Sequence, residues 1–171
     1  DEIQAHAAAM ATIGRFGRID VLVNNAGCGL LGAVEEASAK EVEALFRTNV
    51  FGLLAVTRAV LPSMRRRRAG HIINISSVGG YVGHAGWGVY CSAKFAVEGL
   101  SEALAIELRP LGIHVTAVEP GYFRAALFDS RSFAVSARTI DDYQEPVGAP
   151  TGPNPAQVAD PAELADIVLK L

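Results

Sequence analysis

The sequence predicts an α/β protein built on a parallel sheet. Short apolar runs at 19–25, 71–76 and 113–118 have the length and composition of strands buried on both faces. Patterns with helical periodicity lie between these runs. An alternation of strands and helices is typical of a parallel sheet whose strands are connected by helices. We therefore expect one domain over residues 1–171, with no internal repeat.

The first half of the chain begins with a helical pattern over 1–13, which has no capping residue in front of it and ends at a glycine break. The first strand, 19–25, leads into a glycine-rich loop at 26–32. Ser38 and Glu41 form a capping box, which predicts the start of a long helix that reaches at least Val60.

The second half contains another long helix, predicted over 89–108 between the second and third strands. Residues 122–159 are irregular and carry four of the eight prolines, so we expect them to form a loop region that covers the substrate. The pattern at Asp160 and Pro161 predicts a last helix, because proline is favoured at the first helical position. That helix is expected to be still in progress at Leu171.

Composition excludes several classes of function. The net charge of −3 gives no reason to expect binding to nucleic acid or to an anionic membrane. We identify no apolar run of membrane-spanning length and no signal peptide, so a cytoplasmic protein is expected. The two cysteines, Cys28 and Cys91, are then expected to be reduced thiols. The four histidines lack metal-ligand spacing, and we predict no metal site.

Tyr90, Lys94 and Ser77 are the most informative residues. Tyr90 and Lys94 are four apart in a predicted helix, so they lie on one face, and a lysine there can lower the pKa of the tyrosine. Ser77 ends a strand, where its hydroxyl could hold a substrate oxygen. A surface pair on an amphipathic helix is the alternative, since the spacing alone is common. Together with the motifs upstream, the arrangement favours proton transfer to or from an alcohol or carbonyl oxygen.

The ends of the three predicted strands carry the other candidate residues. Ligands of open α/β sheets bind beyond the carboxyl ends of the strands. Those ends are Asn24-Asn25-Ala26-Gly27, Ser76-Ser77 and Pro120-Gly121. The first could be a simple turn, but its place after a buried strand favours contact with the sugar or base of a cofactor.

Three further motifs have competing interpretations. Gly27, Gly29 and Gly32 fit the dinucleotide-binding spacing, but no helix follows them directly, and we interpret the match as accidental. Asn49 could serve a proton relay or a helix–helix hydrogen bond, and the residues alone leave both open. The four arginines Arg65–Arg68 could bind an anion, but the end of a helix is where cations favour the macrodipole.

Five segments together resemble the short-chain dehydrogenase/reductase family, in its order and at its spacings from about Ile19 to Gly121. The segments are Asn24-Asn25-Ala26-Gly27, Asn49-Val50-Phe51-Gly52, Ile73-Asn74-Ile75-Ser76-Ser77, Tyr90-x-x-x-Lys94 and Pro120-Gly121. The resemblance implies a Rossmann-like, doubly wound parallel sheet. It also implies an NAD(P)-dependent oxidoreductase that interconverts a secondary alcohol and a ketone, and pairing through the two long helices as a homodimer or homotetramer.

The resemblance assigns a role to each motif residue. Tyr90 would be the general acid/base, Lys94 would bind the nicotinamide ribose and lower the pKa of Tyr90, and Ser77 would polarise the substrate oxygen. Asn49 would hold a water in a proton relay. NAD or NADP would contact Asn24, Asn25, Ala26, Gly27, Tyr90, Lys94, Pro120 and Gly121, and the substrate would contact Ser77 and Tyr90.

The sequence departs from the family in two places. The glycine motif that binds the cofactor's phosphates is absent, so we expect the first βα units to be missing and the strand at 19–25 to be an open edge. Ala125 stands where many members have a threonine that contacts the nicotinamide. Two alternatives remain: a non-catalytic fragment or interaction module without cofactor binding, and an epimerase or dehydratase of the same superfamily.

Overall fold

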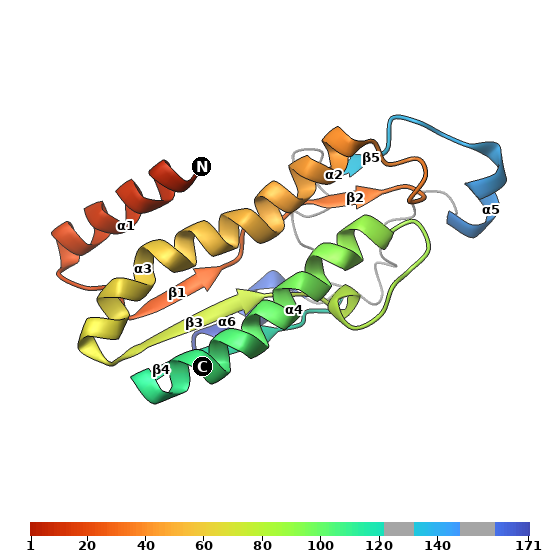
Figure 1. Ribbon diagram of the computed structural model, residues 1–171. Coiled ribbons are helices and arrows are strands. Elements are labelled where there is room, and N and C mark those ends of the chain that lie inside the picture. Colours follow the sequence, from red (N-terminus) through yellow and green to blue (C-terminus); the bar gives the residue numbers. More distant parts are fainter. Residues whose placement is uncertain (122–131, 148–159) are drawn as a thin grey trace.

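A computed structural model describes residues 1–121, 132–147 and 160–171. Its centre is a parallel sheet of β1 (Val21–Asn24), β3 (Gly70–Ile75) and β4 (Ile113–Val118), in the order β1-β3-β4 (Figure 1). The three predicted strands are confirmed, the first of them shorter than expected. Within the described residues β1 pairs with β3 alone, so it is an edge, as predicted.

The helices α1 (Glu2–Phe16), α3 (Leu53–Arg67) and α4 (Gly88–Leu108) enclose the main core against this sheet. The parallel register places Leu22 beside Ile72 and Ile72 beside Val115, so one row of side chains crosses all three strands toward the helices. The residues at the centre of this core are Ala9, Ala59, Val60, Met64, Ile72, Leu108 and Ile113.

The prediction that the strands are buried on both faces is wrong for β1. Val21 and Val23 are 51% and 42% exposed, while Leu22 between them packs against the core. The reason is the two-residue period of a strand, which places alternate side chains on opposite faces. On the face of Val21 and Val23, His71 lies next to Thr116, with 2.8 Å between Nε2 and Oγ1.

The long helix after Ser38 is continuous but not uniform. It begins as α2 (Ala39–Phe46) with the predicted capping box, passes through a π-helical segment, η1 (Arg47–Gly52), and continues as α3. Its end lies at Arg68, which adopts the left-handed conformation. A π-helical segment interrupts regular α-helix and often marks a functional region. Here it contains Asn49.

A second, two-stranded sheet corrects the expected loop at 26–32. β2 (Gly29–Leu31) lies within that segment and pairs in parallel with β5 (Phe133–Val135). The short turn η5 (Asp141–Tyr143) and α5 (Gln144–Val147) follow β5, so part of the expected irregular region has regular structure. Residues 122–131 and 148–159, Ala125 among them, lie outside the described residues.

Both terminal helices also correct the sequence interpretation. Asp1 itself caps α1, because its side chain accepts from the amide of Ile3, and the helix continues past Gly14 to Phe16. The last helix, α6 (Pro161–Val168), begins at the predicted Asp160 cap and ends before Leu171. Two further 3₁₀ turns are η2 (Val78–Gly80) and η3 (Arg109–Leu111).

One helical stretch in the described part of the chain, Ala39–Arg67, is long and apolar enough to cross a membrane by length and composition. This corrects the expectation that no such run exists. The observation is weak evidence for a membrane, because 39% of its most apolar window is buried within the protein. A core helix that covers a sheet passes the same test.

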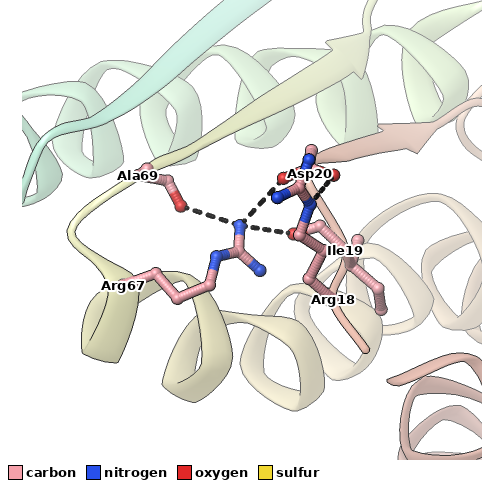
Figure 2. A network of polar contacts seen from close by, with 5 residues as sticks. All are labelled: Arg18, Ile19, Asp20, Arg67 and Ala69. Carbon is pink, nitrogen blue, oxygen red and sulfur yellow. Dashed lines mark hydrogen bonds and ion pairs between the residues drawn. The ribbon is translucent and has the colours of Figure 1, made fainter. Parts of the chain in front are cut away.

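The amino ends of β1 and β3 are joined by Arg67 (Figure 2). Its Nη2 donates to the carbonyl oxygens of Ile19 and Ala69, at 2.9 and 3.2 Å, and lies 3.3 Å from Asp20 Oδ1. Arg18 also pairs with Asp20, at 3.0 Å. Arg67 thus ties the end of α3 to the start of two strands, which supports the structural interpretation of the arginine run.

Candidate active site

Tyr90, Lys94 and Ser77 come together at the carboxyl ends of the strands. Tyr90 is in the first turn of α4 and is 8% exposed, and Lys94, one turn later, is 6% exposed. The Ser77 hydroxyl is a hydrogen-bond partner of Tyr90 and accepts from the amide of Gly79 at 3.1 Å. A Cβ on Gly79 would lie 3.2 Å from Cys91 Sγ, so this glycine allows the loop to pack closely on α4.

Burial raises the pKa of Tyr90 above its ordinary value. The hydrogen bond with Ser77 acts in the opposite direction, but it does not outweigh the cost of ionising a phenol away from water. The pKa of Tyr90 is therefore raised in this structure, and not lowered as expected from the sequence for a tyrosine beside Lys94. In the form described, Tyr90 is a proton donor at neutral pH.

Lys94 is a buried cation whose partner is a neutral oxygen. Its Nζ donates to the carbonyl of Ile75 at 2.9 Å and lies 5.7 Å from the centroid of the Tyr90 ring. Burial lowers the pKa of Lys94 to about 8, and the opposing influence of Cys28 and Glu98 does not offset this desolvation. A lysine ammonium has three donors, so hydroxyls of a ligand could be bound beside Ile75.

Asn49 fixes the chain that follows β1. Its Oδ1 accepts from the amide of Cys28 at 2.8 Å, and its Nδ2 donates to the carbonyl of Cys28 at 2.9 Å. Asn49 is 3% exposed, and the π-helical segment carries it inward. A Cβ on Gly27 would lie 3.5 Å from Asn49 Oδ1 and 3.9 Å from Lys94 Nζ. The segment 24–27 and the Tyr90-x-x-x-Lys94 segment therefore meet through Gly27.

Asn24 has its side chain in a network between the strands and the helices. Its Nδ2 donates to Asn74 Oδ1 at 2.8 Å and to Thr57 Oγ1 at 3.1 Å. Asn74 is fully buried and donates to Ser101 on α4 at 2.9 Å. This network was not predicted from the sequence, although an asparagine inside the apolar run of β3 is a signal for a buried polar partner.

The remaining predicted residues lie at the same edge. Asn25 and Ala26 are exposed on the loop after β1, Gly121 is exposed after β4, and the Pro120 carbonyl is 3.4 Å from the amide of Val78. The described residues contain no group of acidic, histidine or cysteine side chains able to hold a metal.

The glycine motif at 27–32 does not open a helix. Gly29 belongs to β2, and α2 begins at Ala39, so the interpretation of this motif as accidental is confirmed.

Trp87, in the loop before Tyr90, is a neighbour of the site. Its ring packs edge-on against Tyr90, with 5.6 Å between centroids, and lies 5.6 Å from the Phe133 ring on β5. His84, in the same loop, is exposed. The site is therefore connected to the small β2–β5 sheet through an aromatic contact.

The described residues fit the nicotinamide half of a dinucleotide. The fit rests on the buried Lys94, whose hydrogen-bond partner among residues 1–121, 132–147 and 160–171 is the Ile75 carbonyl, and on Gly27, whose lack of a side chain leaves space beside Lys94 and Asn49. Lys94 would hold ribose hydroxyls, and the backbone of residues 24–27 would lie against the cofactor.

Comparison with known proteins agrees with this geometry. The sequence model of the short chain dehydrogenases matches residues 1–134. The 3-ketodihydrosphingosine reductase of Bacteroides thetaiotaomicron is 45% identical over 145 residues, which are 85% of this chain and 54% of that protein. The chain spans between 54% and 59% of the length of the first curated relatives it matches.

Two solved structures extend the comparison to the fold. A short-chain dehydrogenase from Streptomyces avermitilis superposes with a TM-score of 0.88 at 43% identity, covering 99% of this chain and 61% of that one. A gluconate 5-dehydrogenase from Burkholderia cenocepacia, in complex with NADP and tartrate, superposes with a TM-score of 0.73 at 32% identity, covering 76% and 51%. With a family match over most of its length and a site of this form, the chain belongs to the short-chain dehydrogenase/reductase family.

Proposed function

We propose that the natural protein is an NAD(P)-dependent oxidoreductase that interconverts a secondary alcohol and a ketone. The observation that carries the proposal is the meeting of Tyr90, Ser77 and Lys94 at the carboxyl ends of parallel strands. A phenol, a hydroxyl and a cation within one buried site suit the transfer of a proton to a carbonyl oxygen.

The bound nicotinamide cofactor would supply or accept the hydride at the substrate carbon. In ketone reduction, Tyr90 would give its proton to the carbonyl oxygen, and Ser77 would donate a hydrogen bond to the same oxygen. The raised pKa of Tyr90 suits this direction, because the phenol stays protonated at neutral pH. Oxidation requires the phenolate, so its rate should increase with pH.

Lys94 and Asn49 would support the proton transfer. The ammonium of Lys94 favours the phenolate that Tyr90 becomes after giving up its proton. Asn49 uses both ends of its amide on Cys28, so a relay water would be held by its main-chain oxygen. This refines the relay role that the family resemblance implied for Asn49.

The two long helices offer surfaces for the pairing that the resemblance implies. Phe51 in η1 and Phe95 and Ile106 in α4 are 55%, 47% and 70% exposed. Exposed apolar groups of this size favour contact with another protein surface. We propose that two copies pair there. Sedimentation of Phe95→Glu as a monomer, with the parent sedimenting as a dimer or tetramer, would support this.

The function is tested by following NADH and NADPH absorbance with ketones of different length, 3-ketodihydrosphingosine included because a relative is named for it. We expect turnover of a ketone with one of the two cofactors. Cofactor binding without turnover of any ketone or alcohol would reject the oxidoreductase, and absence of cofactor binding would favour a non-catalytic module.

A further inference from the structure

Residues 132–147 pack against β2 and the residues after it, which follow the loop at the end of β1. β5 pairs with β2, the amide of Gly29 donates to the carbonyl of Ser132 at 2.8 Å, and the amide of Ser136 donates to the carbonyl of Leu31 at 2.8 Å. Ser136 packs over Gly32, where a Cβ would collide with its side chain. The attachment is therefore close along the whole length of β5.

Three glutamates extend this attachment beyond the strand, and we name them the carboxylate clamp. Glu41 Oε1 accepts from the amide of Ala137 at 3.0 Å, Glu36 Oε1 from the amide of Ile140 at 2.8 Å, and Glu35 Oε2 from the hydroxyl of Tyr143 at 2.8 Å. The three accepting glutamates lie within residues 35–41, and the three donating residues lie within residues 137–143.

Glu36 differs from the other two glutamates because it is buried. It is 7% exposed, and its second oxygen accepts from the amide of Ala33 at 2.7 Å. One carboxylate thus joins the turn after β2 to the segment after β5. Charge-assisted hydrogen bonds of this kind are stronger than neutral ones, and a buried donor left without its acceptor is costly.

The clamped segment reaches the catalytic tyrosine through two aromatic contacts. Phe133, the first residue of β5, lies against Trp87, and Trp87 lies edge-on against Tyr90. Leu30 of β2 belongs to the same buried cluster as Tyr90. A shift of β5 would therefore be transmitted to the surroundings of the reacting hydroxyl.

We propose that Glu36 is a positioning residue, which holds residues 133–140 so that Phe133 and Trp87 form the substrate side of the Tyr90 site. The inference rests on the proposed function. Glu36 contacts neither of the residues proposed to bind the cofactor ribose or move the proton, so its loss should raise the KM for the ketone and leave cofactor affinity and kcat almost unchanged.

The test compares Glu36→Gln with the matched control Glu43→Gln. Glutamine keeps the shape of Glu36, removes the charge and turns one acceptor oxygen into a donor that faces an amide. Glu43 is exposed and pairs with Arg47, so its substitution makes the same change of charge away from the clamp. Trp87 is the single tryptophan of the sequence, so its emission reports on the Phe133 contact directly.

For Glu36→Gln we expect shifted Trp87 emission, faster amide exchange at 133–140 and a ketone KM raised at least about fivefold, within the range of one charge-assisted hydrogen bond. Gly32→Ala, which displaces Ser136 instead, should give the same three changes, and Glu43→Gln none. Wild-type emission and exchange in both Glu36→Gln and Gly32→Ala would overturn the inference. Altered emission with an unchanged ketone KM would overturn it as well.

Failure of the proposed function gives a different result. In that case the parent protein turns over no ketone, and the positioning role for catalysis is overturned with it. The emission and exchange data then still show whether Glu36 holds β5 and the residues after it in place against β2. Should Glu36→Gln not fold, Glu41→Gln removes a more accessible member of the clamp, and the same outcomes apply with smaller shifts.

Discussion

The two ends of the three-stranded sheet carry polar networks of opposite character. At the carboxyl ends, Asn74, Tyr90 and Lys94 are 0%, 8% and 6% exposed. At the amino ends, the side chains of Arg18 and Asp20, which form an ion pair (Figure 2), are 67% and 57% exposed. The same sheet therefore places one polar group in a dry environment and another in a solvated one.

This difference in burial decides how strongly the charged and polar groups at each end interact. Burial shifts the pKa values of Tyr90 and Lys94 and makes both sensitive to a ligand or substrate beside them. An exposed ion pair such as Arg18–Asp20 is screened and contributes little. The carboxyl end is thus suited to chemistry, while the amino end fixes the start of the strands.

The largest effect should come from removing the phenol at the carboxyl end. We expect Tyr90→Phe to reduce kcat of the natural protein by about 10²–10⁴-fold, the usual contribution of a general acid, with cofactor affinity unchanged. Steady-state kinetics and cofactor titration measure this. Tyr81→Phe is the control, because the Tyr81 hydroxyl is exposed and donates to Glu119. Near-normal turnover of Tyr90→Phe would remove Tyr90 from its role.

Next in size is the loss of the buried amide network. Asn74→Ala removes one buried partner each from Asn24 and Ser101, which keep only their bonds to Thr57 and to the Val97 carbonyl, and we expect it to lower the free energy of unfolding by about 2–4 kcal/mol. Urea denaturation provides the measurement. The exposed Asn25→Ala should change stability by no more than about 0.5 kcal/mol. A similar cost for the two variants would contradict the network's importance.

Lys94 should give the carboxyl end a pH-dependent stability. Its pKa is lowered to about 8 in the folded protein and is higher when unfolded, so between these values the unfolded chain binds the extra proton. Stability therefore rises with pH across this window, by about 2 kcal/mol from pH 8 to pH 10 relative to Lys94→Met. Urea unfolding of both proteins at the two pH values checks the sign, and equal pH profiles would refute it.

The smallest effects belong to the amino end. Arg67→Met loses hydrogen bonds to two carbonyls, and we expect a cost of about 1–2 kcal/mol in unfolding free energy with normal turnover. Arg18→Ala should cost no more than about 0.5 kcal/mol. Thermal denaturation and kinetics of the pair measure this, and a loss of turnover in Arg67→Met would show that the two ends are coupled.

Local patterns made much of this predictable. Tyr90 and Lys94 share a helix face because they are one turn apart, and Ser77 is near them because parallel strands end at one edge. The capping box at Ser38 and the strand at 113–118 were predictable for the same reason, since each depends on residues close in sequence. The resemblance then indicated the family that the comparisons confirm.

Contacts between distant residues were not predictable. The hydrogen bond from Ile140 to Glu36 joins residues 104 apart, and β2 and β5 are each only three residues long. Such short strands carry almost no periodic signal, and their pairing depends on where the rest of the chain has already placed them. The π-helical turn that carries Asn49 inward is likewise a product of packing.

The sequence by itself determined the order of the three main strands and the long helices, the edge at which the polar motifs gather and the residues that could move a proton. The tertiary structure decided how those residues behave. It buried Tyr90 and so raised its pKa, turned Lys94 toward the Ile75 carbonyl, and joined β5 to the site through Trp87. The physical reason is that periodicity acts over a few residues, whereas desolvation and hydrogen bonding depend on every group that packs nearby.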